Sequence, residues 1–136
     1  MNHKMAEEWI KASSLDLKNI KYIIDDEYLT TVVAFHSQQA IEKLFKACFE
    51  FIEVKYPKQH DLINLSNLLK KNDINLKLNN ILLKKINDLY TDSRYPSEFG
   101  LLPDGQPSLE EAKEFYEFAL NIYEQVKNLL EKKTNN

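Results

Sequence analysis

The sequence is poor in the residue types that punctuate folds with many turns. Its 136 residues include two glycines, four prolines and one cysteine, Cys48. So few turn-forming residues disfavour a many-stranded architecture and favour long helices. A single cysteine excludes an internal disulfide. Its neighbours Phe45, Phe49 and Ile52 predict a buried, unreactive thiol.

Long apolar runs and an excess of positive charge are also missing. No run reaches the ~18 apolar residues that cross a bilayer, and no signal peptide is recognisable. We therefore expect a cytoplasmic protein with no membrane partner. The net charge of −3 argues against a broad basic face for nucleic acid but leaves room for a small cationic pocket. The three histidines and one cysteine lack metal-ligand spacing, and no glycine-rich phosphate loop exists, so neither a metal nor a cofactor is expected.

Hydrophobic periodicity predicts an all-α fold with about five helices, three long and two short, in one domain spanning residues 1–136. The first long helix is expected over about His3 to Asp25. The second is expected over about Tyr28 to Glu53, ahead of Pro57, and it is apolar around more than half its circumference. These features indicate an antiparallel up-and-down bundle with the second helix at its centre.

The second half of the chain supplies the two short helices and the last long one. Leucines and isoleucines at helical spacing predict short helices near residues 62–69 and 81–90. A loop over residues 91–107 follows, and loops of this length are often functional. Ser108 and Glu111 form a capping box that predicts the start of the last helix. Residues 132–136 are expected to form a polar tail.

Polar residues within apolar stripes mark candidate functional positions. Asp16 lies in the middle of the apolar stripe of the first helix, so it needs a cation or hydroxyl from another helix. It is either a satisfied core residue that fixes helix register or a carboxylate that orients a ligand site. Ser37 and Gln38 project into the apolar sector of the second helix. A narrower polar strip lies beside them, which is either a solvated edge or a seam in a dimer or cleft: His36, Gln39, Lys43 and Glu50.

Two further positions lie in connecting segments. His60 precedes Asp61 at the start of a predicted helix, where a cap or loop anchor is more usual than a general base. Arg94 is the only arginine of the chain, and Tyr95 and Pro96 follow it. A guanidinium offers a fixed fork of donors suited to phosphate or carboxylate. Arg94 is therefore either a phosphate ligand or a staple that ties the loop to an acidic side chain such as Asp16 or Glu42.

These polar positions resemble those of one known family, the HEPN domains. The first helix, with Trp9 and Asp16, is similar to the opening of these domains. The run FHSQQAIEKLFKA at residues 35–47 resembles their second helix. His60-Asp61-Leu62 before a leucine-rich helix and Arg94-Tyr95-Pro96 before the last helix fit the same order. The resemblance spans nearly the whole chain.

The resemblance carries expectations about partners and activity. It implies a homodimer formed through the long helices and a neighbouring minimal nucleotidyltransferase, in a pair of the toxin–antitoxin type. Active members of the superfamily are metal-independent ribonucleases that use an arginine followed, four to six residues later, by a histidine. This chain has no histidine after Arg94, because His60 is its last one. The usual general acid/base is therefore absent, and ribonuclease activity by that mechanism is in doubt.

Three functional hypotheses follow. The first is a module that binds nucleotide or RNA phosphate and partners a nucleotidyltransferase. In it Arg94 is the central residue and the sole catalytic candidate, and the ligand-binding set comprises Arg94, Tyr95, Asp16, His36, Gln39 and Lys43. The second is a ribonuclease with an altered site, in which His36 or His60 replaces the missing histidine. The third is a purely structural dimeric partner protein without a ligand site.

Overall fold

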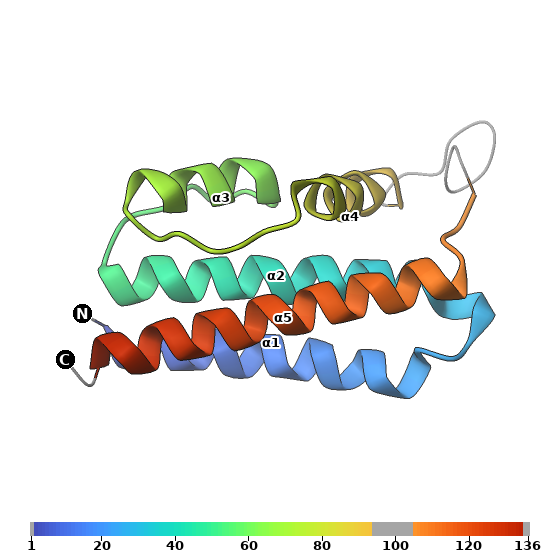
Figure 1. Cartoon of the computed structure of the whole chain (residues 1–136), viewed down its shortest axis with the longest axis horizontal. Coiled ribbons are helices and arrows are strands. Elements are labelled where there is room, and N and C mark those ends of the chain that lie inside the picture. Colours follow the sequence, from blue (N-terminus) through green and yellow to red (C-terminus); the bar gives the residue numbers. More distant parts are fainter. Residues whose placement is uncertain (1, 94–104, 135–136) are drawn as a thin grey trace.

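The fold is built entirely from helices in the part of the chain that the structure describes (Figure 1). The computed structural model describes residues 2–93 and 105–134. The elements in chain order are α1 (His3–Ile23), the 3-10 turn η1 (Glu27–Leu29), α2 (Thr30–Ile52), α3 (Leu62–Lys71), α4 (Asn80–Ser93) and α5 (Leu109–Thr134). The predictions of an all-α class and of five helices, three long and two short, are confirmed.

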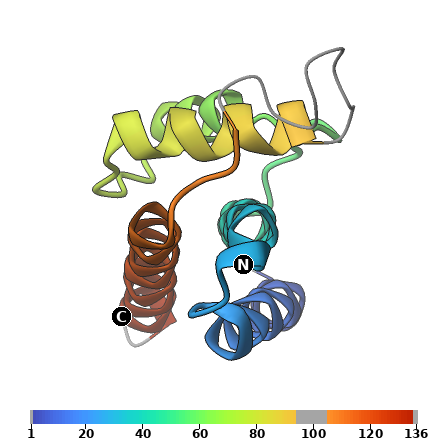
Figure 2. The ribbon, with the colours of Figure 1, turned by 90° about the vertical axis from the view of Figure 1, so that its right-hand side faces the viewer.

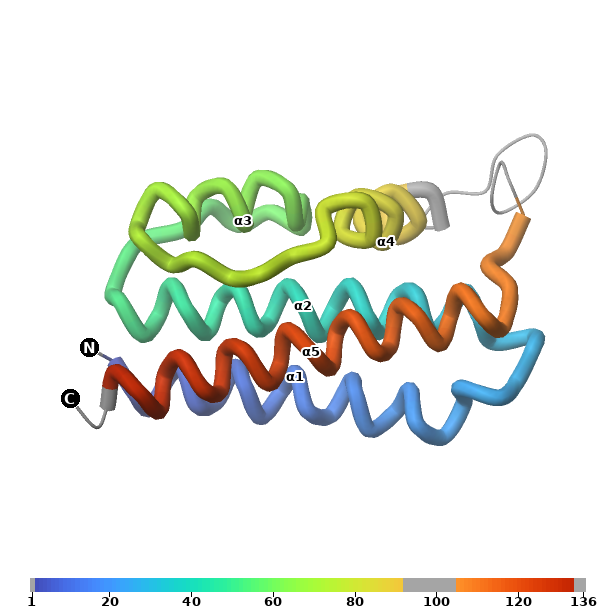
Figure 3. The backbone as a smooth tube through the Cα atoms, viewed as in Figure 1, coloured from blue at the N-terminus to red at the C-terminus, as the bar shows by residue number. Residues whose placement is uncertain are grey.

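The helices form two layers. The three long helices lie side by side as a bundle, and α3 and α4 cover it on one side (Figure 2). The chain runs out along α1 and back along α2, and α5 runs in the same direction as α2 (Figure 3). The segment from α3 to α4 carries the chain back, so that α5 starts near the end of the bundle where α2 starts. The two chain ends therefore lie at the same end of the bundle (Figure 1).

Local capping sets most helix boundaries. Asp26 accepts a hydrogen bond from the amide of Tyr28 at 2.9 Å and starts η1, so α1 ends at Ile23 and α2 begins only at Thr30. The predicted boundaries at 25 and 28 therefore place the break correctly but extend each helix two residues too far. The predicted capping box is confirmed, because the Ser108 amide donates to Glu111 and the Glu111 amide donates to Ser108 Oγ, at 3.2 and 3.1 Å.

Two predicted boundaries of the non-helical segments are wrong by a few residues. Helix α4 continues through Ser93, so the predicted loop that starts at 91 begins three residues too early. Helix α5 continues through Thr134, so residues 132–134 of the predicted tail are helical. Lys132 and Lys133 are exposed, and lysine is a good helix former, so polar character at this end is compatible with helix.

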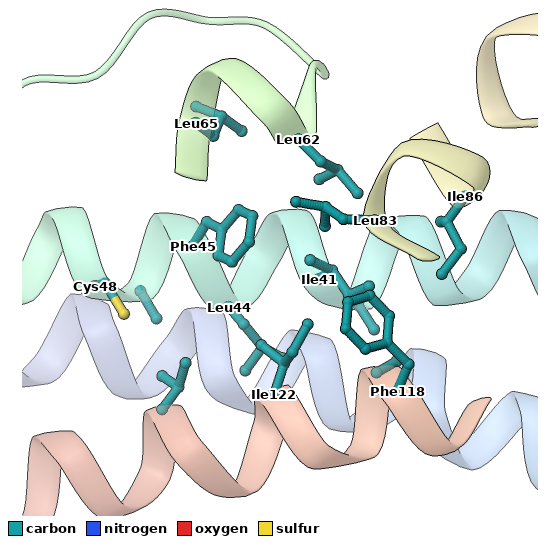
Figure 4. Packing of buried hydrophobic residues seen from close by; sticks show 14 of the residues in the cluster. Ile41, Leu44, Phe45, Cys48, Leu62, Leu65, Leu83, Ile86, Phe118 and Ile122 are labelled. Atoms are coloured by element: carbon teal, nitrogen blue, oxygen red, sulfur yellow. The ribbon is translucent and has the colours of Figure 1, made fainter. Parts of the chain in front are cut away.

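The hydrophobic core surrounds α2. Side chains from all five helices meet there, among them Ile20 of α1. Ile41 and Phe45 of α2, Leu62 of α3, Leu83 of α4 and Ile122 of α5 are each fully buried in it (Figure 4). Helix α2 is central because α1, α5, α3 and α4 all pack against it. A single chain thus covers its wide apolar surface, and this surface does not by itself require a second copy.

Cys48 lies in the same core and is fully buried (Figure 4). Burial raises the pKa of its thiol from 9.0 to about 12, because the thiolate would lose its hydration. A thiol in this state is a weak nucleophile, in agreement with the prediction from its apolar neighbours. No helix in the described part of the chain has the length and apolar character to cross a membrane.

Candidate functional site

One exposed edge of α2 carries the predicted polar strip. Its members are spaced by three or four residues, which places them on one side of a helix, and all are half-buried: His36, Gln39, Lys43, Lys46 and Glu50. The strip lies between α1, which contributes Asp16, and the segment before α3, which contributes His60. Lys46 belongs to the strip although the sequence pattern did not single it out.

Asp16 anchors the first cluster of the strip. Its side chain reaches from α1 to α2, where Oδ2 accepts from Lys43 Nζ at 2.7 Å and Oδ1 lies 3.0 Å from His36 Nδ1. Asp16 is 7% exposed, whereas the side chains of Lys43 and His36 are each 26% exposed. The expectation that a buried Asp16 finds a cation on another helix is therefore met by the geometry.

Glu42 anchors a second cluster of the same composition. Its carboxylate accepts from Lys46 Nζ at 2.8 Å, lies 2.8 Å from His60 Nδ1 and accepts from Gln38 Nε2 at 3.2 Å. Burial alone would raise the pKa of Glu42, but the hydrogen bonds from Lys46, His60 and Gln38 outweigh it and hold the pKa below its ordinary value of 4.5. Glu42 is therefore ionised near neutral pH.

The buried amide of Gln38 joins the two sides of this network. Its Nε2 also donates to the backbone carbonyl of His60 at 3.0 Å, and its Oε1 accepts from Gln39 at 2.9 Å. Asp61 next to His60 caps α3 by accepting from the amides of Ile63 and Asn64. His60 thus anchors the segment before α3 to α2, which was the more usual of the two interpretations of its position.

Aromatic rings close the end of the strip near the start of α2. Tyr90 of α4 packs against Phe35 and His60, with ring centroids 4.9 and 5.8 Å apart. The Phe35 ring also lies edge-on to His36 at 6.3 Å. Further along the strip, Lys46 Nζ lies 5.2 Å above the ring of Trp9. The cationic groups of the strip are therefore flanked by partly apolar surroundings, which strengthen electrostatic contacts.

The geometry defines what the strip can do chemically. Each cluster holds one carboxylate between a lysine and a histidine, so its formal charge is balanced when the histidine is neutral. In each cluster Nδ1 of the histidine faces the carboxylate, which leaves Nε2 on the opposite side of the ring for another partner. Each bonded lysine retains N–H donors, because an ammonium group carries three. The strip is suited to contacts with an oxygen-rich ligand.

The predicted site residues are brought together only in part. Asp16, His36, Gln39 and Lys43 lie on the strip or contact it, whereas Arg94 and Tyr95 lie outside the described residues. Ser37 is fully buried, as its position in the apolar sector indicates, and its hydroxyl has no hydrogen-bond partner among the described residues.

The sequence interpretation missed the cluster around Glu42. A usable signal existed, because Glu42 lies one turn after Gln38 in the same apolar sector of α2, and a carboxylate there needs partners. In the described residues no group of three or more histidines, cysteines or carboxylates is arranged to hold a metal ion.

The comparisons with known proteins agree with this architecture. The chain is a small helical domain, a five-helix bundle with charged residues along its central helix. The model of the HEPN domain family matches residues 6–129. The chain belongs to the HEPN domain family. Its fold is similar to that of ST0689, an archaeal HEPN homologue of known crystal structure, with a TM-score of 0.68 and 24% sequence identity over 93% of this chain and 98% of the other. A comparison with curated protein sequences finds no significant match.

Proposed function

We propose that this chain binds the phosphate groups of a nucleotide or RNA at the polar strip of α2, with Arg94 as the central ligand. It would act in this role as the partner of a minimal nucleotidyltransferase in a pair of the toxin–antitoxin type. The observation that carries the proposal is the cluster of Asp16, Lys43 and His36, in which a buried carboxylate holds two nitrogen-bearing side chains at a half-exposed surface.

Charge balance makes Arg94 the decisive residue. The clusters around Asp16 and Glu42 are each neutral in formal charge, so on their own they offer an anion little net attraction. One guanidinium added beside them would tip the balance and supply the paired donors that phosphate prefers. Tyr90, four residues before Arg94 in the chain, packs against Phe35 and His60, which supports this placement of the site.

A thermal-shift comparison tests the proposal. ATP, GTP and a short RNA are added to wild type, to Arg94→Ala and to Lys84→Ala, a matched change at an exposed lysine of α4. We expect at least one ligand to raise the Tm of wild type and Lys84→Ala, because ligand that binds only the folded state stabilises it. The shift should be absent in Arg94→Ala. An equal shift in Arg94→Ala would refute a phosphate site at Arg94, and the absence of any shift in wild type would favour a purely structural partner.

The Asp16–His36 pair supports a second candidate function, cleavage of RNA at an altered site. A carboxylate that binds Nδ1 orients the ring, so Nε2 of His36 would accept the proton of a ribose 2′-hydroxyl as its oxygen attacks the adjacent phosphorus. The bond from phosphorus to the 5′-oxygen would then break, and water would protonate that oxygen.

The test of this second function is incubation of purified protein with labelled RNA. Cleavage that His36→Ala and Arg94→Ala both stop would support this function, and intact RNA at high protein concentration would exclude it.

A further inference from the structure

The two long helices at opposite ends of the sequence, α1 and α5, leave a groove between them. Both pack closely on α2 but contact each other much less. Two hollows of about 530 and 620 Å³ lie along this junction, and they share Ser14 of α1 and Tyr123 of α5. They therefore form one continuous groove between α1 and α5. The α3 and α4 layer lies on the opposite side of α2 from α1 (Figure 2). No residue of the polar strip lines it.

The groove has the dimensions of a docked helix. Its lining on α1 extends from His3 to Tyr22, which corresponds to roughly 28 Å at 1.5 Å per residue. A straight helix of about 18 residues spans that length. Because α2 already packs against α1 and α5 from the other side, a helix in the groove would complete a four-helix bundle.

The floor of the groove is apolar. Ile10 and Leu17 of α1 and Leu120 and Leu130 of α5 line it, together with the ring of Tyr123. Tyr22 of α1, which also lines the groove, is 80% exposed. The leucine and isoleucine side chains match the apolar face of an amphipathic helix. Tyr22, Tyr116 and Tyr123 also line the groove and offer rings on which a nucleobase can stack, so the test includes an oligonucleotide.

The charged residues along the rim differ between the two ends of the groove. At the end near Tyr22 it is lined by Lys18 and Lys21 and by no acidic residue. At the opposite end lysines and glutamates are mixed, with Glu7 and Glu131 both present. None of the ion pairs found among the described residues involves Lys18 or Lys21. This end is complementary to acidic side chains, although the chain as a whole carries a net charge of −3.

We infer that the α1–α5 groove is a docking site for an amphipathic helix of a partner protein, whose apolar face fills the groove and whose acidic residues face Lys18 and Lys21. Contacts with the leucine floor supply most of the affinity, and the lysines select acidic partners and fix the direction of the helix. The inference concerns a surface remote from the strip, so it does not depend on phosphate binding there.

A fluorescence anisotropy titration tests the inference with a labelled 18-residue peptide that carries leucines on one helical face and glutamates beside them. A second peptide has lysines in place of the glutamates. The double variant Lys18→Glu/Lys21→Glu is compared with Lys70→Glu/Lys71→Glu, a matched charge reversal at exposed lysines of α3. We expect saturable binding of the acidic peptide, weakened about tenfold by the α1 variant and unchanged by the α3 variant, because each reversal replaces attraction by repulsion.

The outcomes of these titrations distinguish which kind of molecule binds in the α1–α5 groove. Saturable binding that prefers the acidic peptide and depends on Lys18 and Lys21 supports the inference. No saturable binding, or equal binding of both peptides, overturns it.

Two further measurements test for other occupants of the groove: sedimentation velocity tests for a second copy of the chain, and titration with a labelled oligouridine tests for nucleic acid. A dimer of wild type that only the α1 variant dissolves assigns the groove to a second copy. Oligouridine binding that only the α1 variant loses assigns it to nucleic acid. Either result also overturns the inference.

Discussion

Two buried carboxylates determine how the exposed edge of α2 is organised at the level of single residues. Asp16 and Glu42 are each nearly buried, and each is held by one lysine and one histidine. A buried charge that lost its partners would cost several kcal/mol, on the order of 3–5. The lysines and histidines are therefore fixed by the carboxylates, and their remaining donors and acceptors have defined positions at the surface.

Replacement of Glu42 by glutamine tests this organisation. Glutamine keeps the shape but removes the charge that Lys46 and His60 face, so we expect a loss of about 2 kcal/mol in the free energy of unfolding at pH 7, less than for a fully buried pair because both partners are partly exposed. The measurement is urea unfolding followed by circular dichroism. Glu114→Gln, at an exposed position of α5, serves as the control and should not change the midpoint.

The pH dependence of the same variant gives an independent result. The pKa of Glu42 is lowered on folding, so its charge stabilises the protein fully above the unfolded pKa, near 4.5. That stabilisation is lost as the pH falls through the lower folded-state pKa. The difference in stability between wild type and Glu42→Gln should therefore shrink below pH 4.5. A difference that stays constant down to pH 3 would show that Glu42 does not stabilise the fold through its charge.

Residue-scale prediction succeeded where a single polar residue interrupts an apolar stripe. Asp16 was expected to meet a cation from another helix, and Lys43 supplies one. The pairing of Glu42 with His60 was missed because the two residues lie 18 positions apart, in a helix and in the segment before α3. Helical spacing predicts neighbours within a helix, but it does not predict which connecting segment returns to that helix. The ligand-binding roles of the strip residues, Arg94 and Tyr95 remain predictions.

At the scale of elements, the caps explain why the helices begin where they do. The capping box of α5 was predictable because both partners are local, three residues apart, and satisfy each other's amide. A break between α1 and α2 was predicted after Asp25, but its extent was underestimated, since residues near its ends continue the apolar periodicity and only the Asp26 cap marks the break. The end of a helix is thus harder to predict from sequence than the presence of the helix, where only one capping side chain marks that end.

Removal of the α5 cap has a measurable cost. In Ser108→Ala the Glu111 amide loses its acceptor, so we expect a loss of about 1 kcal/mol in the free energy of unfolding. Ser108→Asp retains an acceptor and should recover most of that stability. Chemical denaturation of the three proteins provides the values. Equal stability of wild type and Ser108→Ala would show that solvent satisfies the amide equally well.

At the scale of the whole molecule, the α3 and α4 layer and the three-helix bundle share one core. Leu62 and Leu83 of the layer pack in the same buried cluster as Ile41 and Phe45 of α2 (Figure 4). The bundle could be predicted from sequence because wide apolar faces need neighbours. The predicted antiparallel course holds for α1 against α2 and for α1 against α5 (Figure 1). The parallel course of α2 and α5 was not part of that prediction, since it depends on how the two short helices carry the chain back along the bundle.

A shared core predicts that the layer and the bundle unfold together. Ile86 of α4 is fully buried against this core, whereas Ile81 of the same helix is 81% exposed. We expect Ile86→Ala to lower the free energy of unfolding by roughly 2–5 kcal/mol, through lost burial and the cavity left behind, and Ile81→Ala to leave it nearly unchanged. The single tryptophan, Trp9 in α1, reports on the bundle, and far-ultraviolet circular dichroism reports on all helices. Because one cooperative unit unfolds as a whole, both signals should move to the same lower midpoint in Ile86→Ala.

The contrary outcome would be a tryptophan signal that keeps its wild-type midpoint while part of the circular dichroism is lost earlier. The α3 and α4 layer would then be a separate unit, able to detach without unfolding the bundle that carries Asp16 and the polar strip.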